Sequence, residues 1–346
     1  MARIFRKCTV PILSLIVTAI VISGCANASN PAGSGTAYPQ QAAAAIAATP
    51  TVDEGGVPTD PRERWGIDEF VIVLLPGEDT PEVAWTREIF GEALSEALYG
   101  LPVREFHATS FAAVVEAMRF GHAHLAFFGP FSYVTAAERA GAEVFAVVGF
   151  PDPYNEGEYT HGYYSHFITH VDSGIYTLGD LPGRTFGFVD PESTSGNIVP
   201  LNEFVNYFAD ERPDLQPDDL HISGRFFSTS MFTGTHANSI QGVARGDIDA
   251  GVVSSNILTT EIRNGLVDPD QIRIFHSSPR IPGSPQALQR DLPEDLKEIV
   301  INFYLNWDDE EFWAIRGARP GSRHIPATDC EFDVIRELRE RFGLDD

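Results

Sequence analysis

The chain has 346 residues, of which 49 are Asp or Glu and 24 are Lys or Arg, so its formal net charge at pH 7 is −25. Such acidity argues against nucleic acid or an anionic membrane surface as a partner. It permits a small anionic ligand, because surface charges are screened within roughly 8–10 Å at physiological salt. The length is typical of a chain with two domains.

The first residues have the pattern of a secretory signal: three basic residues precede the apolar run "VPILSLIVTAIVI", and "ISGC" follows. This last string resembles the lipobox of bacterial lipoproteins, in which the cysteine is diacylated and becomes the new N-terminus. We therefore expect a signal peptide at 1–24 and a lipid on Cys25, with an uncleaved membrane anchor as the alternative. Because Cys8 is then removed and Cys25 carries the lipid, no intramolecular disulfide is expected in the mature chain.

Residues 25–65 begin with this cysteine, are rich in Ala, Pro, Gly and Thr, and contain almost no large apolar residue. This composition is typical of a disordered linker. The folded part then opens with the predicted strand "DEFVIVLLP", the predicted helix "PEVAWTREIFGEALSEALYG" and the predicted strand "PVREFHA". The alternation of strands and helices predicts an α/β fold with mainly parallel sheets.

Two later segments share one plan of helix, glycine turn, short strand and a polar or Gly-Pro turn into another helix. They are "FAAVVEAMRFGHAHLAFFGPFSYV" and "NSIQGVARGDIDAGVVSSNILT", and 121–128 in the first aligns with 246–253 in the second. The repeat predicts two similar α/β lobes. In open parallel sheets ligands bind beyond the carboxyl ends of the strands, and each unit delivers a loop and a helix start there.

The string "DPESTSGN", residues 190–197, places Ser193, Thr194, Ser195 and Gly196 between a predicted strand and a predicted helix. A helix start has backbone N–H groups without partners and the positive end of the helix dipole, so it can bind an anion. The three hydroxyls would add donors. From this string alone the alternative stays open that one hydroxyl only caps the helix.

Five strings occur together in one order: "EAMRFGHAHLAFFGPFSYVTAAERAGAEVFA", "GYYS", "LPGRTFGFVDPESTSGNIVPLNEF", "GTHANSIQGVARGDIDAGVVSSNIL" and "SPRIPGSPQALQRDLP". With them the chain resembles the phosphonate/phosphite/phosphate-binding proteins of ABC importers, a branch of the type 2 periplasmic-binding-protein fold. The resemblance covers most of 66–300. It implies lobe 1 at 66–166 plus 277–346 and lobe 2 at 167–276, each a mainly parallel sheet flanked by helices. Two hinge crossings are expected near "YYSHFITH" and "IFHSSPRIPG".

The resemblance also implies ligand contacts. In this family the "STSG" turn holds the phosphoryl oxygens, so Ser193, Thr194 and Ser195 are carried over as donors, with His236 of "GTHAN" as their partner.

Three aromatic residues complete the implied site. Tyr163 of "GYYS" is expected to donate its hydroxyl from near a crossing, and Phe111 stands where the family often has tyrosine. Tyr133 of "GPFSYV" either faces the cleft from lobe 1 or packs in the lobe core, and both alternatives are open.

Relatives that take aminoethylphosphonate pair its ammonium with two carboxylates. The matching positions here are neutral, namely Asn256 in "VVSSNIL" and Ser284 in "IPGSP". A buried ammonium without a counter-charge is costly, so the resemblance implies phosphate, phosphite or a short alkylphosphonate as ligand.

Other polar residues indicate no further chemistry. His161, His166 and His170 lack the carboxylate or cysteine spacing of a metal site, so no metal is expected, and Asp249 is expected to support a strand end. The chain contains no "GxSxG", Walker "GxxxxGK[ST]" or "HExxH" motif. After removal of the signal its one lysine is Lys297, on an apparent surface helix, which argues against a Schiff base. We therefore expect no enzyme and no cofactor.

These observations together predict an extracytoplasmic solute-binding lipoprotein. It would be a monomer, held at the membrane by lipidated Cys25, that captures a small phosphorus oxyanion between two closing lobes and delivers it to an ABC transporter permease. The alternative is a sensor lipoprotein that binds a small anion and signals to a membrane partner without import.

Overall fold

The computed structural model describes residues 60–77 and 80–344. The predicted signal peptide, Cys25 and most of the predicted linker lie outside these residues, so the structure does not test them. Within the described ranges, no helix is both long enough and apolar enough to cross a membrane.

The linker prediction is wrong at its end, because helix α2 (Pro61–Trp65) already belongs to the folded part. Asp60 caps this helix by accepting from the Arg62 N–H at 2.9 Å. Trp65 is buried in the core, and its indole N–H donates to Asp295 at 3.1 Å. One buried tryptophan with a satisfied N–H is enough to dock this turn.

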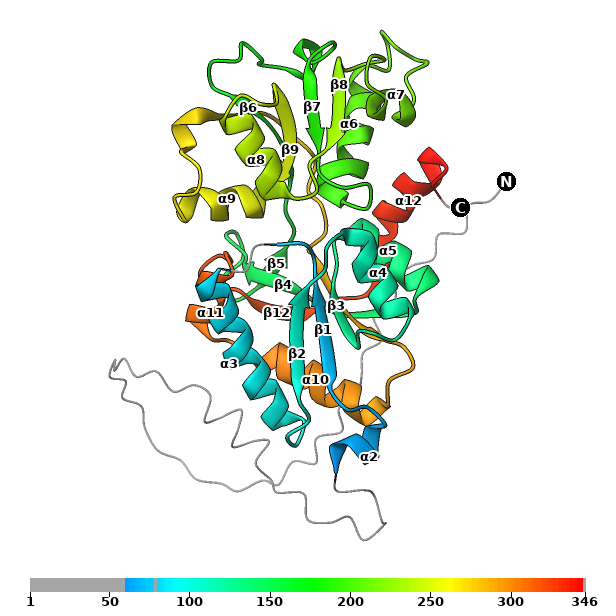
Figure 1. Cartoon of the computed structure of the whole chain (residues 1–346), viewed down its shortest axis with the longest axis vertical. Coiled ribbons are helices and arrows are strands. Elements are labelled where there is room, and N and C mark those ends of the chain that lie inside the picture. Colours follow the sequence, from blue (N-terminus) through cyan, green and yellow to red (C-terminus); the bar gives the residue numbers. More distant parts are fainter. Residues whose placement is uncertain (1–59, 78–79, 345–346) are drawn as a thin grey trace.

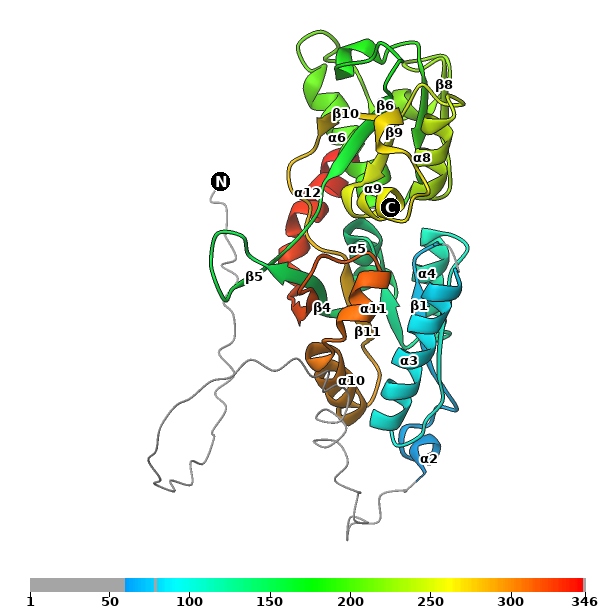
Figure 2. The same ribbon diagram turned by 90° about the vertical axis from the view of Figure 1, so that its left-hand side faces the viewer.

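Two sheets divide the described residues into two stacked bodies, seen from the front in Figure 1 and from the side in Figure 2. The sheet of lobe 1 has the order β12-β4-β11-β3-β1-β2, with β5 beside β4. Its strands are β1 (Phe70–Leu74), β2 (Val103–His107), β3 (Leu125–Phe127), β4 (Ala142–Pro151), β5 (Tyr159–His161), β11 (Pro285–Gln289) and β12 (Arg323–Pro326). The sheet of lobe 2 has the order β10-β6-β9-β7-β8. Its strands are β6 (Ser165–His170), β7 (Thr185–Phe188), β8 (Thr229–Phe232), β9 (Ala250–Ser254) and β10 (Ile272–Ser277).

The predicted lobe boundaries, 166/167 and 276/277, fall within β6 and β10. They remain a proposal for the domain division.

Both sheets are mixed, although the sequence predicted mainly parallel ones. Strand β1 pairs in parallel with β2 and β3, and β7 pairs in parallel with β8 and β9. All other pairings are antiparallel, including β11 with β3 and β6 with β9. The crossings explain this. Strands β3 and β9 end at the lobe boundary, whereas β11 and β6 enter their sheets from that boundary, so each runs antiparallel to its neighbour.

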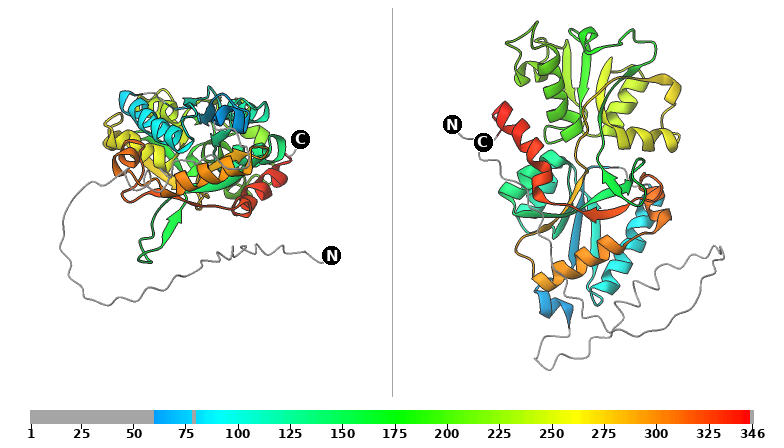
Figure 3. Two further views of the ribbon diagram at one scale, coloured as in Figure 1. Left: turned by 90° about the horizontal axis from the view of Figure 1, so that it is seen from below. Right: turned by 180° about the vertical axis from the view of Figure 1, so that it is seen from behind.

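Helices cover both faces of each sheet (Figures 1 and 3). In lobe 1, one face carries α4 (Phe111–Arg119), α5 (Pro130–Arg139) and α12 (Asp333–Phe342), and the other carries α3 (Pro81–Ala97), α10 (Glu294–Asn306) and α11 (Glu310–Ile315). In lobe 2, one face carries α6 (Val199–Tyr207) and α7 (Pro217–His221), and the other α8 (His236–Ala244) and α9 (Ser255–Arg263). This layering follows from the two-residue period of strands. In β1, Val71 and Val73 pack in the core under α4, α5 and α12, while Phe70 and Ile72 pack in the core under α3, α10 and α11.

The predicted repeat is confirmed. Its copies are α4-β3-α5 and α8-β9-α9, and the aligned residues Leu125 and Ala250 each begin the strand. Strand β3 lies between parallel β1 and antiparallel β11, as β9 lies between parallel β7 and antiparallel β6.

The two predicted crossings run side by side and are joined by a backbone bridge. Tyr163 N–H donates to Ile281 O at 3.1 Å, and Ile281 N–H donates to Tyr163 O at 2.8 Å. Gly162 has a φ of +118°, and a Cβ there would lie 2.6 Å from the Ile281 carbonyl oxygen. Only glycine permits both this conformation and this approach.

Cys330 lies in the short helix η4 (Asp329–Phe332), and the other two cysteines, Cys8 and Cys25, lie outside the described residues. The absence of an intramolecular disulfide from the mature chain therefore stays a prediction.

Candidate ligand-binding site

The candidate site is built on a turn that follows β7 and leads into α6. Thr194–Ile198 forms one π-helical turn, in which Ile198 N–H donates to the carbonyl of Ser193 at 3.2 Å. Ser193, Thr194 and Ser195 are each 1% exposed. Ser193 does cap the turn, because its Oγ accepts from Gly196 N–H at 3.0 Å, but its own proton is left to donate. Single π-turns are rare and are often found at functional sites.

Close packing against the end of β7 holds this turn in place. A Cβ on Gly196 would lie 2.3 Å from the Cβ of Val189, so only glycine fits. The Val189 N–H also donates to the carbonyl of Gly196 at 3.0 Å. The glycine that the sequence analysis placed in an anion-binding turn is therefore required by close packing of the backbone.

Lobe 1 and a crossing both contact the hydroxyl of Thr194. The backbone N–H of Phe131, at the start of α5, donates to Thr194 Oγ1 at 2.7 Å. Since the oxygen accepts there, the hydroxyl hydrogen is left to be donated elsewhere. The Tyr163 hydroxyl is hydrogen-bonded to the side chains of Thr194 and Ser195, and burial raises the pKa of its phenol to about 12, so it stays protonated. Residues of both lobes and of a crossing thus meet at this point.

Ser195 is fixed through its backbone. Ser165, fully buried at the start of β6, donates its hydroxyl proton to the Ser195 carbonyl at 2.6 Å. The Ser165 N–H in turn donates to Ser278 Oγ in the other crossing at 3.0 Å. The hinge strands therefore support the turn directly.

His236, the first residue of α8, has a defined tautomer. The Ser254 N–H donates to its Nδ1 at 3.1 Å, so the ring proton of the neutral form is on Nε2. His236 is half-buried as a residue, and desolvation of its ring by surrounding protein atoms lowers the pKa of His236 to about 4. Gly234 N–H donates to Val189 O at 2.7 Å, which sets the "GTH" turn beside the end of β7. His236 is thus a neutral hydrogen-bond donor at the lobe boundary.

The turn also docks on the helix starts of lobe 1, which the sequence analysis missed. The backbone N–H of Phe111, the first residue of α4, donates to the carboxylate of Asp190, whose pKa burial raises. Thr135 Oγ1 of α5 donates to Glu192 Oε2 at 3.1 Å. A Cβ on Gly129 would lie 3.2 Å from Thr194 Oγ1 and 3.8 Å from the Phe111 ring, so those two groups are neighbours. No local signal marks Asp190 as a contact between lobes.

Tyr133 does not face the cleft, so its assignment as a ligand residue is wrong. It is 1% exposed, its hydroxyl donates to Asp329 Oδ1 at 2.7 Å, and its ring packs on Phe332 with centroids 4.8 Å apart. The alternative of core packing holds because this face of α5 is turned toward η4 and α12.

The two neutral positions lie on opposite sides of the lobe boundary. Asn256 is exposed at the second position of α9, and Ser284 is half-buried just before β11. Among the described residues neither side chain hydrogen-bonds to the turn, so their role stays a prediction.

The remaining polar residues have structural partners. His161 Nδ1 accepts from Gly283 N–H at 3.0 Å while its Nε2 pairs with Glu331 at 3.0 Å, and His166 Nδ1 contacts Ser277 Oγ at 2.9 Å. Across 60–77 and 80–344, no three or more His, Cys, Asp or Glu side chains are grouped to hold a metal ion.

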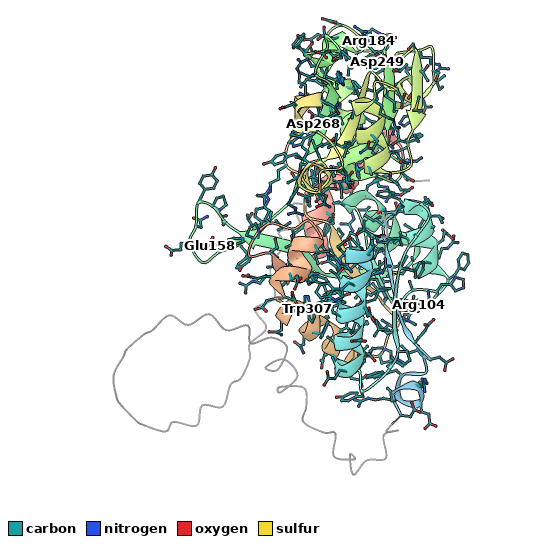
Figure 4. All side chains as sticks on the ribbon, turned by 60° about the vertical axis from the view of Figure 1, so that its left-hand side comes forward. Arg104, Glu158, Arg184, Asp249, Asp268 and Trp307 are labelled. Atoms are coloured by element: carbon teal, nitrogen blue, oxygen red, sulfur yellow. The ribbon has the colours of Figure 1, made fainter. Side chains whose placement is uncertain are left out.

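Asp249 supports a strand end as predicted. Its Oδ2 accepts from both the N–H and the hydroxyl of Thr185, each at 2.8 Å. Figure 4 shows Asp249 and Arg184 at the end of lobe 2 that is remote from lobe 1.

Lys297 is not a surface residue, because its side chain is only 10% exposed on α10. Burial alone would lower the pKa of its ammonium, but ion pairs with Glu294 at 3.1 Å and Glu143 at 3.3 Å raise it. These carboxylates keep the amine charged.

A family model described as "ABC transporter, phosphonate, periplasmic substrate-binding protein" matches residues 72–325. The chain belongs to this family. It is 27% identical over 242 residues to the phosphonates-binding periplasmic protein of Escherichia coli K12, a match that covers 69% of this chain and 65% of that protein, slightly under two thirds. It is also 27% identical over 294 residues to the phosphate-import protein PhnD of Mycolicibacterium smegmatis, covering 80% of this chain and 86% of that protein.

Solved structures of such proteins share the fold. A binding component of an ABC phosphonate transporter from Pseudomonas aeruginosa matches with a TM-score of 0.64 at 22% identity, covering 80% of this chain and 87% of the other. PhnD1 of Prochlorococcus marinus in complex with methylphosphonate also matches with a TM-score of 0.64, at 19% identity, covering 80% and 98%. The fold is therefore that of the periplasmic binding proteins of phosphonate transporters.

Proposed function

We propose that the protein is the extracytoplasmic binding component of an ABC importer and captures a small phosphorus oxyanion between its lobes. The observation that carries this proposal is the buried turn with the hydroxyls of Ser193, Thr194 and Ser195. The Nε2–H of His236 is a further donor, on the helix whose preceding turn is bonded to the end of β7. The start of α8 adds the positive end of a helix dipole, and the turn before it is held to the end of β7 by the Gly234 N–H bond to Val189 O. Family membership supports the proposal, as do relatives named for phosphonate binding and for phosphate import.

Closure of the lobes would complete the set of donors. The N–H of Phe131 reaches Thr194 Oγ1 only when lobe 1 lies against lobe 2, as it does here. In that arrangement Thr194 Oγ1 accepts from Phe131 N–H, so its proton becomes available to the anion when its hydrogen bond with the Tyr163 hydroxyl is exchanged for one with the ligand. Exclusion of water at closure would strengthen each charge-assisted hydrogen bond.

The neutral side chains of Asn256 and Ser284 argue for phosphate, phosphite or a short alkylphosphonate over an aminoalkyl ligand. A buried ammonium would find no carboxylate at either position. We expect methylphosphonate to bind more tightly than aminoethylphosphonate in side-by-side titrations. The double change Asn256→Glu with Ser284→Asp should shift the preference toward the amino compound, and tighter binding of that compound by the unchanged protein would contradict the argument.

The lipid anchor on Cys25 is proposed from the sequence alone. Metabolic labelling with a fatty-acid probe should mark the protein, and Cys25→Ala should abolish the label. A label that persists in this variant would exclude Cys25 as the attachment site.

A panel of ligands tests the proposed function as a whole. Phosphate, phosphite, methylphosphonate, sulfate and nitrate are each added to the protein, and the melting temperature is recorded. A ligand that binds only the folded state raises stability by RT ln(1 + [L]/Kd), so even moderate binders register. We expect shifts for phosphorus oxyanions and recovery of the ligand chemically unchanged. The absence of any shift with every phosphorus compound would refute the proposal.

A further inference from the structure

His221 and Asn197 form a hydrogen-bonded chain behind the turn that carries the three hydroxyls. Asn197 Nδ2 donates to the carbonyl of Pro191 at 2.8 Å, and His221 Nε2 lies 2.8 Å from Asn197 Oδ1. A carbonyl oxygen can only accept, so the amide nitrogen must face Pro191 and the amide oxygen must face His221. The imidazole therefore donates from Nε2.

Burial makes this chain costly to break. Asn197 is 4% exposed, and its amide nitrogen and oxygen each have one hydrogen-bond partner, Pro191 and His221 respectively. The His221 ring packs edge-on against Phe188 with centroids 4.9 Å apart and lies 5.0 Å from the ring of Phe232. Removal of the imidazole donor would leave the Asn197 oxygen unpaired in a poorly hydrated place.

The hydrogen bonds from His221 to Asn197 and from Asn197 to Pro191 hold the segment that carries the proposed ligand donors. Pro191 and Asn197 stand on either side of Ser193, Thr194 and Ser195, so the bond between them closes the turn into a loop of fixed width. His221 fixes the one side chain that makes this closing bond, and it does so from α7.

We propose that His221 and Asn197 are positioning residues that set the spacing of Ser193, Thr194 and Ser195, and thereby the affinity for the oxyanion, without touching it. This inference rests on the proposed function of the turn. It predicts that a side chain remote from the ligand controls binding through a single N–H donor.

Three variants test the inference by calorimetric titration of methylphosphonate or inorganic phosphate, whichever the unchanged protein binds more tightly. His221→Phe keeps a ring of similar size but removes the donor, and it should weaken binding by about five- to fiftyfold. His221→Gln restores an N–H donor and should bind within about threefold of the unchanged protein. His170→Phe, a control in β6 of the same lobe, should leave the affinity unchanged.

The affinity of the folded protein separates positioning from general stabilisation, because a purely structural role would lower the melting temperature without changing the Kd measured well below it. Unchanged affinity in His221→Phe, or failure of a folded His221→Gln to restore binding, would overturn the inference. If the unchanged protein binds neither compound, the proposed function fails and the inference falls with it. Should His221→Phe not fold, the imidazole nitrogen resonances of the unchanged protein decide: a proton on Nε2 supports the chain, and a neutral ring protonated on Nδ1 contradicts it.

Discussion

Replacement of His236 by alanine should weaken oxyanion binding strongly while the protein stays folded. The side chain supplies one N–H donor, because Ser254 N–H occupies Nδ1 and the proton is on Nε2. A hydrogen bond to a charged group contributes about 1.5–3 kcal/mol, which corresponds to a loss of roughly ten- to 150-fold in affinity. The Ser254 N–H loses its acceptor, but His236 is only half-buried, so water can take the place of the removed ring and accept from this N–H.

Isothermal titration calorimetry at neutral pH measures the effect, with circular dichroism to confirm folding. His122→Ala is a matched control, because His122 is an exposed histidine of lobe 1. It should bind like the unchanged protein. A folded His236→Ala variant with unchanged affinity would remove His236 from the site and refute the reasoning.

The pH dependence of binding tests separately whether His236 binds the anion as a neutral donor. Burial holds the pKa of His236 at about 4, below its ordinary value of 6.5, so the ring is neutral and donates from Nε2 at every pH above about 5. Between about pH 8 and pH 5.5, titration of His236 should therefore contribute no gain in affinity. A gain below pH 6.5 that disappears in His236→Ala would show that the ring binds as a cation instead.

Three further outcomes follow from individual contacts. Tyr133→Phe removes a hydroxyl that is hydrogen-bonded to Asp329, so it should lower the free energy of unfolding by about 1 kcal/mol and leave the ligand Kd unchanged. Weaker binding by this variant would indicate that Tyr133 contacts the ligand. Gly196→Ala forces a Cβ to within 2.3 Å of Val189, so it should destabilise the protein by about 1–3 kcal/mol, lower its melting temperature and weaken binding. An unchanged melting temperature together with an unchanged Kd would mean that the backbone of the turn shifts to accommodate the methyl group. Burial lowers the pKa of His324 to about 3 from 6.5, so its contribution to stability is complete above pH 6.5 and is lost as the pH falls toward 3. Urea unfolding at several pH values should show this loss of stability, and the free energy of unfolding of His324→Phe should fall less steeply with falling pH. Equal pH dependence of the free energy of unfolding in the two proteins would show that His324 does not cause it.

Local patterns in the sequence predicted the repeated units well. In both copies the helix, the glycine turn and the strand are encoded within about two dozen neighbouring residues, so periodicity is sufficient. The end of the linker was also within reach, since "DPRERW" contains a capping Asp60, a proline at the first helical position and a tryptophan to anchor the turn.

Contacts between distant residues explain what the sequence did not predict. The directions of β6 and β11 depend on which way the chain returns from a crossing, and no local pattern encodes that. Tyr133 could point to either side of α5, and only its distant partner Asp329 decides between them. The bond from Phe131 N–H to Thr194 joins residues 63 positions apart in the sequence, and a backbone donor leaves no trace in composition.

The central claim is that the turn of Ser193, Thr194 and Ser195 holds a phosphorus oxyanion. Its most direct test is calorimetric titration of methylphosphonate and inorganic phosphate into the unchanged protein and into the triple variant Ser193→Ala, Thr194→Val, Ser195→Ala. We expect saturable binding of at least one of the two compounds by the unchanged protein and no measurable binding by a triple variant that is still folded. Equal binding by the two proteins would contradict it.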